Sequence, residues 1–172
     1  MVRTRRAFLE TLPLAIAAVL SVRSALAQSP PSARDFAGEV AVATMFGIES
    51  ATLALQKSSS PAIKDYAHRL ADDHARAASQ LRRIVARRSD IALPDRPDGR
   101  HLDMIRDLGA LQGEAFDKAY AAAQRDAHRE LAALLEAYAR NGGDPELKAF
   151  AAEALPLFRD LAGQAQALKP AP

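Results

Sequence analysis

Cysteine is absent from this chain of 172 residues. Its absence excludes a disulfide framework, a thiol nucleophile and a thiolate metal site. It also excludes the lipid anchor of a lipoprotein, which needs a cysteine directly after the cleavage site. Any bound metal ion would therefore depend on His, Asp and Glu side chains, or on Met thioethers in the case of copper(I).

Strand-like patterns and familiar catalytic motifs are lacking as well. Aromatic residues make up 5% of the chain, and no stretch alternates apolar and polar residues as a half-buried strand does. The sequence contains no Ser-His-Asp constellation, glycine-rich phosphate loop or nucleotide fingerprint. These absences favour an all-α protein and argue against a hydrolase or a nucleotide-binding enzyme, so we expect a non-catalytic protein.

The N-terminal residues 1–27 have the features of an export signal. Arg5-Arg6 stand before Phe8-Leu9, a modest apolar run follows over residues 12–20, and Ala25-Leu26-Ala27 is a small-x-small cleavage site. The apolar run is shorter than the roughly 20 residues of a membrane span. The arginine pair is typical of a twin-arginine signal. We predict cleavage after Ala27 and export to the periplasm; an amphipathic N-terminal helix is the alternative.

The net charge argues against a nucleic-acid partner. Four of the 23 Lys and Arg residues and one of the 21 Asp and Glu residues lie in the first 27 positions. The remaining chain therefore carries 19 basic and 20 acidic side chains. This near-neutral balance lacks the excess of positive charge that would attract a nucleic-acid backbone. For the mature protein we expect no transmembrane span and an unknown protein partner.

The 145 residues after the signal are enough for one domain with its own core. Proline and glycine at the turns separate four long helical segments and a short one between the second and third. They are expected at Ala33 to Lys57, Pro61 to about Arg88, Arg100 to Leu111 (the short one), Gly113 to Asn141, and Pro145 to about Leu168. The pattern predicts a four-helix bundle over residues 28–168, with a long connector carrying the short helix, and a frayed tail at 169–172.

Three polar residues fall on or beside the apolar stripes of these helices. His74 stands on the stripe of the second helix, Glu49 on that of the first, and His128 at the edge of that of the third. An α-helix rises about 1.5 Å per residue, so each of the three residues lies about 15–22 Å along its helix from the neighbouring turn. The three can therefore lie in one layer near the middle of the bundle. Asp117 lies three helical turns from His128 and cannot join them.

One carboxylate and two imidazoles suit a divalent or iron-type metal ion. The alternative is a buried ion pair between Glu49 and His74, with His128 pointing to solvent. His68 and His101 are expected to be exposed.

Several phrases of the sequence together are similar to one known family. They are Phe36-Ala37-Gly38-Glu39-Val40-Ala41, Phe46-Gly47-Ile48-Glu49, Ser59-Ser60-Pro61-Ala62-Ile63-Lys64-Asp65-Tyr66-Ala67, Leu70-Ala71-Asp72-Asp73-His74, Ala92-Leu93-Pro94, Phe116-Asp117-Lys118-Ala119-Tyr120, His128, Asp144-Pro145-Glu146-Leu147-Lys148-Ala149 and Ala154-Leu155-Pro156. Their order resembles the bacterial exported family called domain of unknown function 4142. That family is assigned to the ferritin-like superfamily, and some members carry an outer-membrane label. The resemblance covers residues 35–167 and implies a ferritin-like bundle, but no established activity.

The chain departs from that family at one position. Members usually carry a histidine in the last helix, a few residues after the Leu155-Pro156 pair. Here the stretch reads Phe158-Arg159-Asp160-Leu161, so Asp160 is the one polar residue that could take its place. The paired Glu-x-x-His motifs of di-iron bundles are also missing.

Three functions stay open from the sequence. The first is an exported periplasmic bundle of unknown activity that supports envelope stress tolerance. The second is a ferritin-like metalloprotein that binds iron, manganese, zinc or copper through Glu49, His74, His128 and Asp160. The third is a bundle that binds a protein partner at the outer membrane.

Overall fold

The computed structural model describes residues 31–168. The predicted signal peptide and the tail at 169–172 lie outside this range. Within it the chain forms five α-helices and no strand: α1 (Ala33–Lys57), α2 (Pro61–Val85), α3 (Gly99–Ala110), α4 (Gly113–Asn141) and α5 (Pro145–Ala167). The all-α class predicted from the sequence is confirmed.

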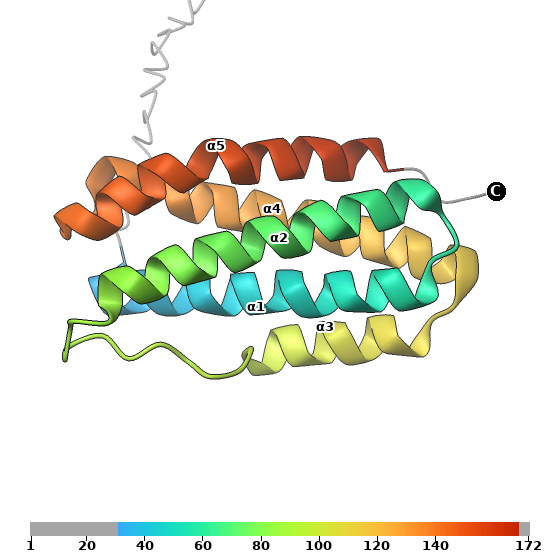
Figure 1. The fold of residues 1–172 in the computed structure, drawn as a ribbon, viewed down its shortest axis with the longest axis horizontal. Helices are drawn as coiled ribbons and strands as arrows, with labels where there is room; N and C mark the ends of the chain where they lie inside the picture. Colours follow the sequence, from blue (N-terminus) through green and yellow to red (C-terminus); the bar gives the residue numbers. More distant parts are fainter. Residues whose placement is uncertain (1–30, 169–172) are drawn as a thin grey trace, which may run out of the picture.

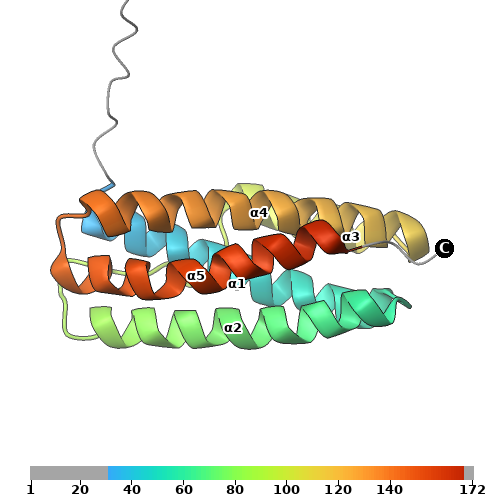
Figure 2. The ribbon, with the colours of Figure 1, turned by 90° about the horizontal axis from the view of Figure 1, so that it is seen from above.

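The four long helices lie side by side and enclose one core (Figure 1). α1 packs against α2 and α4, and α5 packs against the same two helices. The connector and α3 run back along the molecule, so α2 and α4 point in the same direction (Figures 1 and 2). α3 contacts α1 and α4 from outside. The connector therefore covers the seam between α1 and α4.

Local sequence features fix the helix ends close to the predicted positions. The Ser32 hydroxyl caps α1 by accepting a hydrogen bond from the backbone N–H of Asp35 at 3.1 Å. Pro61 begins α2, where its missing N–H costs nothing. α2 ends at Val85, three residues earlier than predicted. The chain leaves the helix there because Ile91 returns to the core, where it is buried.

Bulky apolar side chains fill the end of the core where α1 begins and α4 ends. The Phe36 ring stacks on Tyr138, with ring centroids 3.8 Å apart, and meets the edge of Phe150. Of the described helices, α1 is the one long and apolar enough to pass the length and hydropathy test for a membrane span. Its buried residues pack into this core, which accounts for its apolar character.

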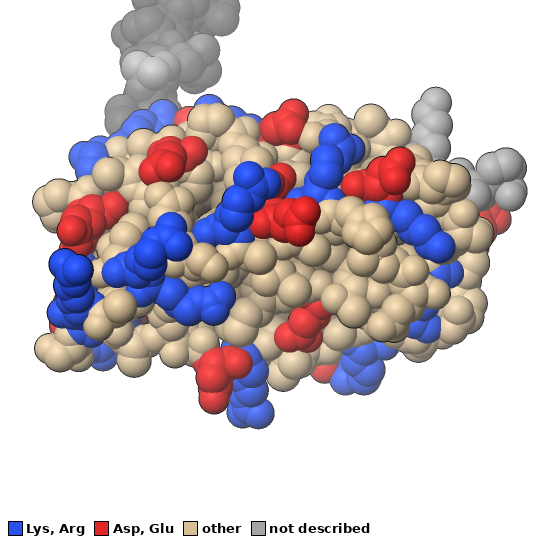
Figure 3. All heavy atoms as spheres, in the orientation of Figure 1, with Lys and Arg blue, Asp and Glu red and all other residues tan. Residues whose placement is uncertain are grey.

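Charged side chains of both signs are interspersed over the face in Figure 3. Basic side chains gather toward the end of this face where α2 ends in Figure 1. Arg82 and Arg83 stand in the last turn of α2. Positive charge at that place interacts favourably with the carbonyl end of the helix dipole.

Candidate histidine site

Two of the predicted site residues meet in the middle of the bundle. His74 comes from α2 and His128 from α4, and their side chains are 2% and 1% exposed. Their Nε2 atoms lie 3.2 Å apart. The Phe158 ring from α5 closes the pair on one side, with its centroid 5.1 Å from that of His74. Helices far apart in the sequence thus bring both imidazoles into one buried layer.

Glu49 does not join this pair, because it lies on the exposed face of α1. The sequence places the buried stripe of α1 on Val42, Phe46, Glu49 and Leu53. Phe46 is buried and Leu53 packs against the core while partly exposed, Val42 is partly exposed, and Glu49 is exposed, so the stripe is wrong for Glu49. The residues of α1 that face the core are mostly small, among them Gly47, Ser50, Ala51 and Ala54. A Cβ atom on Gly47 would lie 2.2 Å from His74 Nδ1. The His74 ring therefore rests on the bare backbone of α1.

Asp160 is also exposed, and its carboxylate accepts a hydrogen bond from Gln164 on the same helix. Phe158 and Leu161 take the inward face of α5 instead. Among residues 31–168 no group of three or more His, Asp or Glu side chains is placed to hold a metal ion. The predicted layer of one carboxylate and two imidazoles is thus reduced to the imidazoles.

Asp117 lies near the start of α4, away from the histidines, but is buried. Its Oδ1 has no hydrogen-bond partner among the described residues. The sequence predicts its distance from His128 but not its burial.

Both histidines are neutral at pH 7 because the core disfavours an imidazolium. Burial, with a smaller contribution from the nearby His128, lowers the pKa of His74 to about 3, although the backbone of Thr44 and Ala43 acts in the opposite direction. Burial likewise lowers the pKa of His128, partly offset by its hydrogen bond to Gln124. The lowered values follow from desolvation of the charged form.

The hydrogen bonds fix which nitrogens carry the protons. His128 Nδ1 lies 2.7 Å from the backbone oxygen of Gln124, so this nitrogen donates. Its Nε2 then holds a lone pair and accepts the hydrogen bond from Nε2–H of His74. This leaves His74 Nδ1 as an acceptor, and it has no partner in the described part of the chain.

The side-chain amide of Gln124 has a defined orientation. The Ser50 hydroxyl donates to the Gly47 carbonyl at 3.1 Å, so its oxygen accepts from Gln124 Nε2 at 3.0 Å. The amide oxygen Oε1 must therefore point the other way, and it is buried without a partner among residues 31–168. Gln124 gives no signal in the sequence, because glutamine beside an alanine-rich stripe is ordinary on a helix surface.

A small enclosed space lies beside these unpartnered atoms. Gln124, His74 and His128 line it together with Gly47 and four apolar residues, Ala43, Phe46, Ala127 and Leu131. It leaves about 10 Å³ for the centre of a water molecule, which is close to the room that one water needs. Gln124 and His74, whose Oε1 and Nδ1 are acceptors without partners among the described residues, are two of its lining residues, so the space suits a small donor of hydrogen bonds or a cation.

The two Nε2 atoms are also spaced as ligands of one metal ion would be. With metal–nitrogen bonds of about 2.0–2.1 Å and a tetrahedral angle, two nitrogens lie about 3.3 Å apart, and the observed separation is 3.2 Å. Metal-bound histidines generally donate their other N–H to a carbonyl or carboxylate, as His128 does to Gln124. The nitrogen donors present are thus two neutral imidazoles, and Gln124 lines the small space beside them.

Comparison with known proteins gives the chain a family and a fold relative. The family model described as Domain of unknown function (DUF4142) matches residues 19–168. The chain belongs to this family. No curated protein matches the sequence. A solved structure described as CopM in the Cu(II)-bound form resembles this DUF4142 protein with a TM-score of 0.65 and 17% identity, over 78% of this chain and 93% of that chain. At this identity the likeness concerns the fold.

Phe158 lies in the stretch where the DUF4142 resemblance leads one to expect a histidine, and its side chain faces the histidine pair. Its ring lies at 90° to His74 and at 31° to His128, with centroids 5.1 Å and 6.3 Å away. An imidazole at this place would contact the same pair. This DUF4142 protein therefore has an apolar wall at the position from which α5 could have contributed a further ligand.

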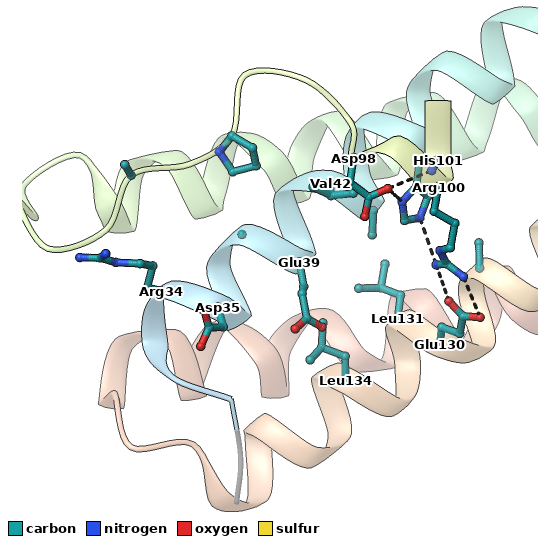
Figure 4. A pocket seen from close by; sticks show the side chains of 15 residues that line it. Arg34, Asp35, Glu39, Val42, Asp98, Arg100, His101, Glu130, Leu131 and Leu134 are labelled. Atoms are coloured by element: carbon teal, nitrogen blue, oxygen red, sulfur yellow. Dashed lines mark hydrogen bonds and ion pairs between the residues drawn. The ribbon is translucent and has the colours of Figure 1, made fainter. Parts of the chain in front are cut away.

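A larger groove of about 600 Å³ lies under the connector, between α1 and α4 (Figure 4). His101 borders it and is buried, contrary to the exposed position expected from the sequence. Its Nδ1 lies 2.7 Å from the Asp98 carboxylate, and its ring packs near Phe46. The Asp98 cap holds the start of α3 and fixes His101 in the same contact.

Proposed function

We propose that this DUF4142 protein is an exported, non-catalytic helical bundle of the ferritin-like type that holds one copper ion at the His74–His128 pair. The observation that carries the proposal is the 3.2 Å separation of the two buried Nε2 atoms. The pair is neutral at pH 7, so no net proton has to leave the site, and the proton on His74 Nε2 has only to move to Nδ1 of the same ring to free the second nitrogen ligand.

Copper suits this donor set better than the other metals considered from the sequence. Imidazole is a good ligand for copper, whereas manganese prefers carboxylates and carbonyl oxygens, and Glu49 and Asp160 lie on the surface. Structural zinc is almost always held by four ligands, and the site offers two nitrogens and one amide oxygen. The fold relative described as Cu(II)-bound adds support from a separate protein.

His74, His128 and Gln124 would hold the ion. With both Nε2 lone pairs turned to it, His74 would carry its proton on Nδ1. The backbone of Ala43 and Thr44 favours a protonated His74 ring. Gln124 keeps His128 oriented through its backbone oxygen and is itself held by Ser50. By holding copper, the protein would store or buffer a redox-active cation, which fits a role in envelope stress tolerance.

Titration of the metal-free protein with copper(I), in competition with a chelating indicator, tests this proposal. We expect one ion per chain, and a loss of binding in His74→Ala and in His128→Ala. His68→Ala is the matched control, because His68 lies on the exposed face of the same helix as His74. Zinc should bind more weakly than copper. Binding that survives in both site variants, or is absent from the wild-type protein, would reject the copper site.

Export forms the second part of the proposal and has its own test. Replacing Arg5 and Arg6 by lysine should leave the precursor in the cytoplasm, if the arginine pair directs twin-arginine transport. N-terminal sequencing of the protein from the periplasm should begin at Gln28. Normal periplasmic yield from the lysine variant would contradict the twin-arginine route, and it would leave the copper site unaffected.

A further inference from the structure

The groove and the histidine cavity share a wall. Three residues line both spaces: Ala43 from α1, and Ala127 and Leu131 from α4. Two of the three are alanines, so the seam between α1 and α4 is thin at the depth of the histidine pair. Ala43 and Ala127 are partly exposed, while Leu131 is buried. The outer surface of the seam is thus the floor of the groove, and its inner surface faces His74 and His128.

The charge of the groove favours a cation. Its lining carries four acidic side chains, Asp35, Glu39, Asp98 and Glu130, and two basic ones, Arg34 and Arg100. Arg100 is paired with Glu130, and Asp98 with His101 (Figure 4). The Glu39 carboxylate lies over the groove beside Leu134 (Figure 4). Burial, with the nearby Asp35 charge, raises the pKa of Glu39, and a nearby cation would stabilise its ionised form.

The opposite approaches to the pair are filled by larger groups. Phe158 packs against both imidazoles from α5. Near Tyr66, His128 Nδ1 donates its hydrogen bond to the Gln124 carbonyl, and the Tyr66 hydroxyl lies 3.5 Å from the same nitrogen. The wall of Ala43, Ala127 and Leu131 is the part of the cavity lining that also borders the groove.

We propose that the groove beneath the connector is the route by which cations reach the histidine pair, and that Ala43 and Ala127 form its narrow neck. This inference rests on the proposed function for the identity of the cation, which is copper. The neck opens by small displacements of α1 against α4, and its width depends on the size of the side chains at positions 43 and 127. A larger side chain at either position closes it.

Chemical modification of the metal-free protein tests the route without any metal. Diethyl pyrocarbonate reacts with neutral imidazoles, and mass spectrometry of peptides gives the rate at each histidine. In Ala127→Leu we expect modification of His74 and His128 to slow on the order of tenfold, the effect of a barrier higher by about 1.4 kcal/mol. The exposed His68 serves as the internal reference. Its rate should stay the same in every variant.

Ala132→Leu is the matched control. Ala132 also lies on α4 and is partly exposed, but it borders a different groove, formed with α5. It should leave the rates at His74 and His128 unchanged. Ala43→Leu closes the neck from α1 and should repeat the effect of Ala127→Leu, which keeps the test open if one variant fails to fold by circular dichroism.

Equal rates at His74 and His128 in wild type, Ala127→Leu and Ala43→Leu would overturn the route. The same variants should slow copper uptake in stopped-flow mixing to a similar extent. Slower modification in a protein that binds no copper would support the route and reject the proposed function. Copper binding with unchanged uptake and modification rates would support the proposed function and reject the route.

Discussion

The aromatic end of the core and its middle layer are built on different principles. At the end, Phe36, Tyr138 and Phe150 fill the space with rings that stack or meet edge to face. In the middle, small residues of α1 let the polar side chains of α2 and α4 approach its backbone, as Gly47 does for His74. The aromatic end gains mainly from packing, although the Tyr138 hydroxyl is buried there without a partner among the described residues. The middle layer keeps two such atoms, Gln124 Oε1 and His74 Nδ1, which a protein retains only where the rest of the core offsets their cost.

The first prediction concerns the aromatic end, where the largest effect is expected. Phe36→Ala should lower the free energy of unfolding by about 3–5 kcal/mol, because it removes a fully buried ring and leaves a cavity. Urea unfolding of the metal-free protein measures this. Copper binding should persist in the fraction that folds, because Phe36 is absent from the lining of the histidine cavity. A loss below about 1 kcal/mol would mean that the end of the core is loosely packed.

The second prediction moves to the middle layer. Gly47→Ala should cost about 1–3 kcal/mol, because the new methyl group overlaps the His74 ring and forces it to move. It should also weaken copper binding, unlike Phe36→Ala. Gly38→Ala on the same helix is the control. Nothing lies within 4 Å of a Cβ atom there, so helix propensity should raise stability by up to about 1 kcal/mol. Equal stability and equal copper binding in Gly47→Ala and Gly38→Ala would contradict the close contact with His74.

The third prediction uses pH to separate the two regions. The pKa of His74 is about 3 in the folded protein and about 6.5 in the unfolded chain. Below pH 6.5 the unfolded state therefore binds a proton that the folded state does not, so stability falls as the pH is lowered. Between pH 6.5 and 5 the loss approaches about 1.4 kcal/mol per pH unit for this residue, and His128 adds to it in the same direction.

Denaturant unfolding across that window, where most carboxylates stay ionised, measures the pH slope. His74→Gln should reduce it by about 1.4 kcal/mol per pH unit. His68→Gln should leave it unchanged, because His68 is exposed. Identical slopes for His74→Gln and the wild-type protein would mean that His74 is charged in the folded state.

The same contrast explains which parts of the molecule could be predicted from the sequence. The stripe of α2 is correct as far as Leu81, including His74, because its bulky residues and their spacing agree. The stripe of α1 is wrong because hydrophobicity favours Val42 and Leu53, while close approach of another helix requires Gly47 and Ser50 to face inward. Packing distance, rather than hydrophobicity, decides the orientation of that helix.

The stripe of α4 shows a related limit. The sequence favours Ala123, Ala127 and Leu134 on the buried face, but these are partly exposed, and Gln124 and His128 are buried instead. A buried glutamine becomes favourable only when its partners are in place, and Ser50 belongs to a different helix. Such a pair leaves no periodic pattern in one segment, whereas Glu49 falls on the apparent stripe of α1 and Asp160 follows the Leu155-Pro156 pair, so the sequence points to these carboxylates instead.

The smallest effect is expected at Ser50, whose hydroxyl joins α1 to α4 through Gln124. Ser50→Ala removes the hydroxyl that accepts from Gln124 Nε2 and donates to the Gly47 carbonyl. The net cost of such a hydrogen bond is about 1 kcal/mol. Without it the Gln124 amide is free to turn its Oε1 away from the histidine cavity, so copper affinity should fall although His74 and His128 are intact.

Thr52→Ala is the control, because its hydroxyl bonds only to the Ile48 carbonyl on the exposed side of α1. Competition titration should give weaker copper binding in Ser50→Ala and an unchanged value in Thr52→Ala. Equal affinities would remove Gln124 from the ligand set and leave the two histidines as the entire site.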